Sequence, residues 1–397
     1  MGNSASLVNV KVFSDKKKKR VMFIEANQDF VEVVCSFMTL PLGTIARHFY
    51  NNNGNNLGRL TSIYQSVVNL DVAHFTNNKC REDLVNPINA SYDLCKNLVF
   101  NLNDTGFKAT IGKAAEPVFL KKKGSFIITD DLTITPVFLD TYIQLLTTLG
   151  VKDMNDLVEQ TVSFGFEAFY RLLRCSLYTK NPLTNVVFGR GWSYSFTASK
   201  LSDLSKPTMA KFVIQKSKEK VLCAQVDNIF VELLFSFLTI PLGAVVRLTD
   251  DKKSVFDSSV AIHNLSNSIS KLGDENYFKS EDIKKRLVEP MLASNYQSVT
   301  DFLPHIYKQD TVKGSFLKEK ASLVVSDDMQ ILVSPSVDTF SKFTSGIPVD
   351  DIELLPLSIG EQEALLILNL SLHSKSVLTN FFKSSPHYKE KVKGGAK

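Results

Sequence analysis

Two pairs of adjacent aspartates, Asp130-Asp131 and Asp327-Asp328, stand at matching places in the two halves of the sequence. Paired carboxylates are residues that hold Mg²⁺ or work as an acid and a base. Each pair, however, falls between two β-prone runs, where aspartate side chains commonly bond to the backbone of a turn. We therefore interpret both pairs as turn residues, with a metal or acid–base site as the alternative.

Other residues with chemical potential are few. His74, Cys80 and Cys95 lie in one region, but their spacing does not fit a zinc finger or ribbon. The segment 106–114 (GFKATIGKA) resembles a phosphate-binding loop, yet it has five residues between its glycines, and Ala114 replaces the required hydroxyl. We expect no catalytic residue, metal or cofactor, and favour a protein that is not an enzyme while leaving that point open.

The composition points to a folded protein of the cytoplasm. Hydrophobic residues make up 44% of the 397 residues, and the formal net charge is only +5. Basic residues are not concentrated on one element, which argues against a nucleic-acid partner. The five cysteines have no paired spacing, which favours reduced thiols. We also find neither a membrane-spanning apolar run nor a secretion signal.

The N-terminus offers an alternative location at a membrane surface. Gly2 follows Met1, and Ser6 completes a myristoylation pattern. A basic run, Lys16–Arg20, lies close by in the sequence. An acyl chain together with a basic cluster stabilises membrane attachment, so Gly2 is a lipidation candidate.

The sequence contains an internal repeat. Residues 11–47 and 211–247 align without a gap and are identical at 14 of 37 positions. Three later blocks recur in the same order, including FLKKKGSFIITDDLTI against FLKEKASLVVSDDMQI and LYTKNPLTNVVF against LHSKSVLTNFFK. We interpret the chain as a tandem duplication with two repeat domains, 9–188 and 209–383. The Gly- and Ser-rich residues 189–208 are the expected linker, and 384–397 the expected basic disordered tail.

Within each repeat, the pattern predicts an α+β fold. β-prone runs flank the charged turns KKKKR and KSKEK, which indicates hairpins. A stripe of apolar residues at helical spacing follows, then further helices, a second β pair around the aspartates, and closing helices. Each repeat should therefore run hairpin, helices, hairpin, helices.

A short motif in both repeats predicts a break between two helices. Pro41 and Pro241 each disfavour helical geometry in the preceding residue and suit the first turn of a new helix. Thr39 is a candidate cap for that turn, while Gly43 and Gly243 allow another segment to pack close to the backbone. We interpret the motif as a structural joint, with a ligand-binding loop as the alternative.

Two charged pairs recur at this joint. Glu32 precedes Arg47 by the same number of residues that separate Glu232 from Arg247. We predict ion pairs Glu32–Arg47 and Glu232–Arg247 that hold two helices together across the joint.

The Lys-rich hairpin, DFVEVVCSFMTLPLGTIAR, ITDDLTITP and KNPLTNVV together resemble the plant family called domain of unknown function 674. The resemblance extends over both repeats. It implies a plant protein with tandem domains and brings no established activity. Members of the family often carry paired cysteines, which would imply a small zinc site, but only Cys80 and Cys95 occur in that region here.

These observations favour a non-catalytic interaction or binding module with an unknown protein partner. The alternative is a small-molecule-binding protein or enzyme whose site lies between the two repeats. The first hypothesis predicts exposed apolar patches. The second predicts a pocket lined by titratable groups from both repeats.

Overall fold

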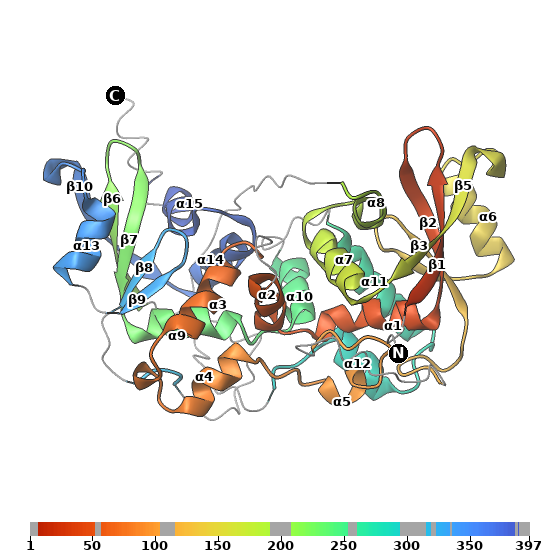
Figure 1. The fold of residues 1–397 in the computed structure, drawn as a ribbon, viewed down its shortest axis with the longest axis horizontal. Coiled ribbons are helices and arrows are strands. Elements are labelled where there is room, and N and C mark those ends of the chain that lie inside the picture. The colour runs from red at the N-terminus through yellow and green to blue at the C-terminus, as the bar shows by residue number, and fades with distance from the viewer. Residues whose placement is uncertain are drawn as a thin grey trace, which may run out of the picture. The chain divides into compact units, whose positions relative to one another are not determined.

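The computed structural model describes residues 7–51, 57–103, 116–190, 208–252, 260–293, 315–318, 323–333 and 336–385, together with Tyr388. The chain forms two compact units (Figure 1). Unit 1 comprises Met1–Leu40, Asn89–Ser195 and Pro241–Met291, and unit 2 comprises Pro41–Ile88, Phe196–Ile240 and Leu292–Lys397.

The units do not have the boundaries of the predicted repeat domains. The residues 41–88 belong to the first repeat in sequence but to unit 2 in space, and 241–291 belong to the second repeat but to unit 1. The two units thus exchange equivalent segments. The ranges 9–188 and 209–383 remain a prediction about how the sequence repeats, and neither range is a compact unit by itself.

Unit 1 contains a five-stranded antiparallel sheet with the order β4-β3-β2-β1-β5. Its strands are β1 (Val8–Asp15), β2 (Arg20–Asn27), β3 (Ser125–Thr129), β4 (Ile134–Pro136) and β5 (Leu157–Phe164). Alternate residues of β1 are buried, as expected for a strand with one face toward a core. The basic run forms the β1–β2 turn, as the hairpin prediction requires.

The helices of unit 1 come from both repeats. They are α1 (Gln28–Ser36), α5 (Tyr92–Cys95), α6 (Leu139–Thr148), α7 (Phe166–Tyr178), α8 (Pro182–Phe188), α10 (Leu242–Lys252), α11 (Ala261–Asp274) and α12 (Glu281–Val288), with 3-10 turns η1 (Phe37–Thr39) and η3 (Met154–Asp156). The side chain of Asn27 caps α1, because it accepts a hydrogen bond from the Phe30 N–H. The core includes Phe30, which lies 5.0 Å from Phe164 and 5.3 Å from Phe169 between ring centroids.

Unit 2 repeats this plan, with the sheet order β10-β6-β7-β8-β9. Its strands are β6 (Thr208–Gln215), β7 (Lys220–Val226), β8 (Leu323–Ser326), β9 (Ile331–Val333) and β10 (Ile352–Ile359). Its helices are α2 (Leu42–Asn51), α3 (Leu60–Asn69), α4 (Asn78–Val85), α9 (Asn228–Phe237), α13 (Val337–Thr344), α14 (Glu361–His373) and α15 (Val377–Ser384), with 3-10 turns η2 (Val72–His74) and η4 (Val349–Asp351). The predicted α+β class is confirmed.

The predicted element order omitted a strand and a helix in each half. Strand β5 pairs with β1, and β10 pairs with β6, at an edge of each sheet. Helices α6 and α13 precede these strands and contain no fully buried residue. Edge strands with one exposed face carry many polar residues, so β5 did not show the apolar run of a buried strand.

The chain changes units at the predicted joint. Helix α1 ends at Ser36, η1 follows, and Leu40 has extended backbone before α2 begins at Leu42. The passage from unit 1 to unit 2 falls between Leu40 and Pro41. In the second repeat, the chain passes back between Ile240 and Pro241. The joint is therefore the point of segment exchange.

Candidate functional site

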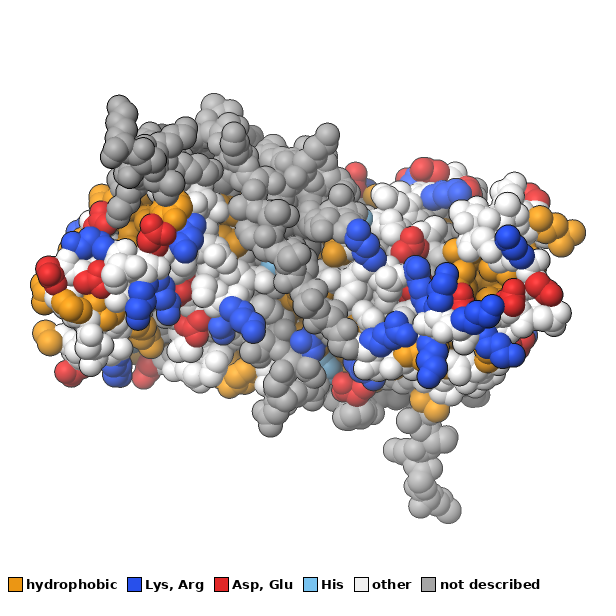
Figure 2. Space-filling model, turned by 90° about the horizontal axis from the view of Figure 1, so that it is seen from above, with side chains coloured by type: hydrophobic (Ala, Val, Ile, Leu, Met, Phe, Trp, Pro, Cys, Tyr) orange, Lys and Arg blue, Asp and Glu red, His pale blue; other side chains and the backbone are white. Residues whose placement is uncertain are grey.

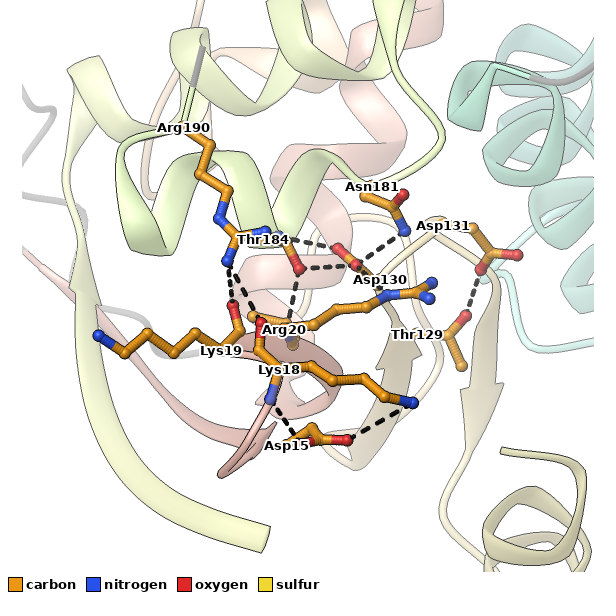
Figure 3. A network of polar contacts seen from close by, with 11 residues as sticks. Asp15, Lys18, Lys19, Arg20, Thr129, Asp130, Asp131, Asn181, Thr184 and Arg190 are labelled. Carbon is orange, nitrogen blue, oxygen red and sulfur yellow. Dashed lines mark hydrogen bonds and ion pairs between the residues drawn. The ribbon is translucent and has the colours of Figure 1, made fainter. Parts of the chain in front are cut away.

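Asp130 lies in a closed hydrogen-bond network in unit 1 (Figure 3). Its Oδ1 accepts the Thr184 N–H at 2.8 Å. Its Oδ2 accepts bonds from Thr184 Oγ1 at 2.7 Å, Asn181 Nδ2 at 2.9 Å and Arg20 Nε at 3.3 Å. Thr184 Oγ1 in turn accepts the Val21 N–H, so the network joins β2 to the start of α8. Asp130 is a tether between elements.

Asp327 makes the equivalent tether in unit 2. Its two carboxylate oxygens accept the Thr379 N–H at 2.8 Å and Thr379 Oγ1 at 2.9 Å. Thr379 Oγ1 accepts the Val221 N–H at 3.0 Å. This arrangement joins β7 to α15 and places the aspartate beside the first turn of that helix.

All four aspartates lie in turns between two strands, as predicted, but the side chain of only one aspartate in each pair bonds within its turn. Asp131 bonds to Thr129, and Asp328 bonds to Ser326, two residues back along the chain. Asp130, by contrast, is only 3% exposed and reaches a distant helix. The sequence did not reveal the long-range bonds of Asp130 and Asp327, because nothing local to them indicates that Thr184 and Thr379 lie nearby.

Burial affects the charge of both tethering aspartates. It raises the pKa of Asp130 and of Asp327 above the ordinary aspartate value. The bonds from Thr184 and Thr379 act in the opposite direction, because they stabilise the carboxylate. Since the Asp130 oxygens already accept four bonds, this group has little capacity for a further ligand or proton acceptor role.

A cavity of about 360 Å³ opens beside Asp327 in unit 2. This volume lies within the range of small-molecule sites. Its lining includes four cationic side chains and two acidic ones, an excess of two formal positive charges: Arg59, Lys220, Lys342, Lys375, Asp327 and Asp328. Ser326 and Ser376 add hydroxyl groups, and Val221, Leu222 and Phe343 add apolar surface. We call this cavity the unit 2 pocket.

The pocket combines residues of both sequence repeats. Arg59 comes from the first repeat, and the other lining residues come from the second. The Arg59 N–H donates to the Ser371 carbonyl oxygen at 2.6 Å, and its Nε donates to the Lys375 carbonyl oxygen at 3.0 Å. Its Nη1 lies 3.8 Å from Asp328 Oδ2. The guanidinium is thus oriented before any ligand binds.

Gly58 makes this placement of Arg59 feasible. It has a φ of +52°, a conformation that glycine adopts without steric cost. A Cβ there would lie 2.2 Å from the Leu372 carbonyl oxygen and 2.4 Å from that of Ser371. Only glycine allows the backbone before Arg59 to approach the end of α14 so closely.

The three lysines of the pocket keep their charge available. Within the described part of the chain, no acceptor forms a hydrogen bond or an ion pair within 4 Å with the ammonium of Lys220, Lys342 or Lys375. Lys220 does exert an electrostatic effect, because it lowers the pKa of Asp327 against the larger effect of burial. Sequence reasoning missed the pocket because five separate segments contribute to it.

The predicted pairs Glu32–Arg47 and Glu232–Arg247 are not formed. The Glu32 carboxylate instead accepts three consecutive backbone N–H groups, those of Val118, Phe119 and Leu120, at 2.6 to 2.9 Å. Glu32 belongs to unit 1 and Arg47 to unit 2. The prediction was wrong because it assumed that both helices of a repeat pack on each other.

Glu232 has the same role in unit 2, where it accepts the N–H groups of Phe316 and Leu317 and the hydroxyl of Ser315. Burial raises the pKa of Glu232, as it does that of Glu32. The segment that each glutamate binds also pairs with an exchanged segment, through the bridges Leu120–Phe278 and Phe75–Leu317. Both glutamates therefore fix the strand-like segment on which exchanged residues dock.

The joint arginines and glycines serve the exchanged helices. Arg47 Nη1 donates to Asn86 Oδ1 at 2.9 Å. Arg247 Nη1 lies 3.8 Å from Glu289 Oε2, at the matching position. A Cβ on Gly43 would lie 2.7 Å from Pro87 Cγ. A Cβ on Gly243 would lie at the same distance from the Cγ of Pro290, the equivalent proline of the second repeat. These glycines allow close packing at each exchange point.

Three further predictions concern residues near the joint or thiols. Thr39 does not cap α2, because its hydroxyl donates back to the Ser36 carbonyl oxygen at 2.9 Å. Cys95 is buried in unit 1 and lies 3.5 Å from Thr39 Oγ1, whereas His74 and Cys80 belong to unit 2. All five cysteines are free. Among the described residues, no group of three or more metal-binding side chains forms a metal site.

Several predictions fall on residues that the structure does not describe. Gly2, the linker residues 191–207, the loop 106–114 and most of the tail lie outside the described ranges. Within the described residues, no helix has the length and apolarity needed to cross a bilayer.

The basic turn lies away from the start of β1. The eight residues of β1 separate its ends by about 23 Å, and Lys16–Arg20 follow its far end. Gly2 precedes Val8 by six residues, which span at most about 21 Å when extended. The full extent of this segment is thus slightly shorter than the length of β1.

Comparison with known proteins agrees with the resemblance noted above. A family model described as "Protein of unknown function (DUF674)" matches residues 4–110, 106–312 and 304–395. No curated protein and no solved structure matches the chain. Three matching segments in tandem also agree with a repeated sequence. Since the segments extend over nearly the whole chain, the protein belongs to the family of unknown function DUF674.

Proposed function

We propose that the protein is a non-catalytic binding protein and that it holds a small anionic molecule in the unit 2 pocket. The observation that carries this proposal is the convergence of four cationic side chains on one cavity of about 360 Å³. The pocket is lined by titratable groups from both repeats, which is the feature expected of the small-molecule alternative rather than of a protein-interaction module. Electrostatic complementarity then favours an anion.

Binding fits the pocket better than proton transfer does. The buried aspartate that a general base would require, Asp327, already accepts two hydrogen bonds from Thr379. The groups that face the cavity without partners are ammonium ions, which supply charge and hydrogen-bond donors at neutral pH. The described lining therefore offers recognition of charge and no activated nucleophile.

The proposal is tested by screening the full chain against small organic anions with isothermal titration calorimetry. A double variant, Arg59→Ala with Lys342→Gln, removes two cations of the pocket. Lys211→Gln is the matched control, because Lys211 is an exposed lysine of the same unit outside the lining. We expect ligands whose binding is lost in the double variant and kept in the control. If every ligand binds both variants equally, the unit 2 pocket is not the site.

A protein partner is the second candidate, and exposed apolar side chains favour it. Phe138, Leu139 and Ile143 on or beside α6 are 55%, 78% and 56% exposed. Hydrophobic side chains also lie on the surface near α13 (Figure 2), where Val337 is 85% exposed. Leu139→Glu is expected to abolish co-purification of a specific partner from plant tissue, and unchanged co-purification would remove α6 from consideration.

A further inference from the structure

We infer that the ligand of the unit 2 pocket is a small molecule that carries a phosphate monoester group. This inference rests on the proposed function, because it names the chemical class of anion that the same pocket holds. It goes further in specifying both the charge of the ligand and the type of group attached to it.

The charge of the lining fits a dianion. Four cationic and two acidic side chains leave an excess of two positive charges, and Asp327 accepts hydrogen bonds from Thr379 of α15. A phosphate monoester carries about −1.5 to −2 charges at neutral pH and presents three acceptor oxygens. A monocarboxylate has a single charge and would leave one excess cation of the pocket without a counterion.

The types of donor also fit phosphate. Arginine presents several N–H donors in a fixed plane, and lysine acts as a mobile point charge, so the two together are common around phosphate. The Arg59 plane is fixed at Nε by the Lys375 carbonyl oxygen, while no described residue accepts a bond from its Nη2. Ser376, which precedes α15, is also in the lining, where its hydrogen bond to Asp327 lowers the pKa of that aspartate against the larger effect of burial.

The pocket has room for more than the phosphate. Its volume of about 360 Å³ greatly exceeds that of one phosphate group, and Phe343 with Leu222 forms an apolar side. Phe343 and Leu222 are only partly buried against the sheet, so their surfaces remain accessible to a ligand. An organic group of moderate size, attached through the ester oxygen, would contact this side.

The other unit supports the assignment, because it lacks two of these cations. Ser66 and Ser268 are equivalent, since each accepts the backbone N–H at the start of the short strand β9 or β4. Counting back seven residues from each serine places Ala261 of unit 1 where unit 2 has Arg59. The shared Asp-Thr of α6 and α13 likewise places Gln144 where unit 2 has Lys342.

The experiment compares phenyl phosphate with benzoate by calorimetry on the full chain at constant ionic strength. We expect phenyl phosphate to bind more tightly, and to lose about tenfold or more in affinity in the Arg59→Ala, Lys342→Gln double variant. Lys211→Gln should leave its affinity unchanged. If melting curves show that the double variant is unfolded, Lys342→Gln alone serves instead, because the Lys342 ammonium has no partner within the described structure.

The pH dependence gives a second readout. The second ionisation of phosphate has a pKa near 6, whereas benzoate is fully ionised above about pH 5. The ratio of the two affinities should rise several-fold between pH 5 and 7.5. Benzoate keeps one charge over this range, so a rise in the ratio reports the second charge of the phosphate group.

Each other outcome is decisive. If benzoate binds as tightly as phenyl phosphate and is lost in the double variant, the phosphate inference is overturned while the proposed function stands. If neither probe binds, or if both probes bind the double variant normally, the proposed function and the phosphate inference are both wrong. If the protein binds vesicles containing phosphatidic acid, but neither vesicles of phosphatidylcholine alone nor phenyl phosphate, the phosphate belongs to a lipid headgroup and the small-molecule form is wrong.

Discussion

The two units place the same tether in different surroundings. In unit 1, Arg20 donates to Asp130, and the positions equivalent to the charged residues of the unit 2 pocket hold two cations and two acids: Arg20, Lys180, Asp130 and Asp131. In unit 2, Lys220 stands in place of Arg20, and the additional Arg59 and Lys342 produce an excess of positive charge. The Asp–Thr tether is therefore a property of the fold. The additional cations around it are a property of one copy, and they are the basis on which we propose a binding site in unit 2 alone.

The largest expected effect comes from Gly58→Val, which introduces the residue found at the equivalent position 260. Valine disfavours a φ of +52°, and its Cβ would overlap the end of α14, so unfolding free energy should fall by about 3 kcal/mol or more. Phenyl phosphate binding should be lost as well. Urea denaturation measures the first effect and calorimetry the second.

Gly124→Ala is the control for this prediction, because a Cβ at Gly124 has its nearest neighbour at 3.8 Å. Stability close to that of the wild type is expected for the control. A Gly58→Val protein with wild-type stability and binding would show that Arg59 reaches the pocket without the close approach of Gly58.

A smaller loss of stability is expected when either tethering aspartate is replaced, and the loss should differ between the two units. Asp130→Asn should lower stability by about 2 kcal/mol and Asp327→Asn by about 1 kcal/mol, since Asp130 also accepts bonds from Asn181 and Arg20. An amide cannot accept hydrogen bonds on its nitrogen, so each variant leaves a donor unsatisfied. Urea denaturation at pH 7 measures the difference, and equal losses would contradict the comparison.

The unfolding free energy of these two variants should also depend on pH differently from that of the wild type. Burial raises the pKa of both aspartates above 3.8, so the native state keeps a proton to higher pH than the unfolded chain does. Their contribution to stability is therefore most favourable below that value and declines as the pH rises through the raised native pKa. The asparagine variants should lack this decline, which a series of urea titrations from pH 3 to 7 would show.

A transplant gives a weaker but constructive test. Ala261→Arg with Gln144→Lys gives unit 1 the cations of unit 2, and it is made in the Arg59→Ala, Lys342→Gln background. We expect little or no recovery of phenyl phosphate affinity, because Ala261 is fully buried and Val260 precedes it where unit 2 has Gly58. Recovery to the affinity of the wild type would show that the close approach of Gly58 is not needed. No recovery in a folded protein would mean that cations alone do not define the pocket.

Membrane attachment is the smallest expected effect. Gly2 precedes one end of β1 and the basic turn follows the other, and a single acyl chain binds a bilayer only marginally. Gly2→Ala should therefore shift only a small fraction of the protein from the membrane pellet to the supernatant at low salt. A pellet fraction that is large in the wild type and absent in Gly2→Ala would establish the anchor proposal despite the distance.

What the sequence revealed depended on how local each signal was. Short stretches of neighbouring residues were enough to predict the hairpins, the helix break at Pro41 and the repeat itself. Together these features predicted the α+β class. The exchange of 41–88 and 241–291 left no local trace, because an amphipathic helix has the same pattern whichever equivalent core it covers. For this reason the prediction of an ion pair between Glu32 and Arg47 was wrong, although both residues do recur in the second repeat. Arg59 escaped notice because its counterpart in the repeat is alanine.

The segment exchange has a consequence for the synthesis of the protein. Helices α2 to α4 are made early, yet the β8–β9 strands and α14 of their unit lie beyond residue 320. At about 5 to 20 residues per second, the ribosome needs on the order of 10 to 50 s to cover that interval. During this time the apolar helical segment 41–88 has no complete native partner, while the nearly equivalent core of its own repeat is made first. The order of translation therefore favours premature pairing of 41–88 with its own repeat, and a chaperone that shields this segment would increase the yield of the exchanged form.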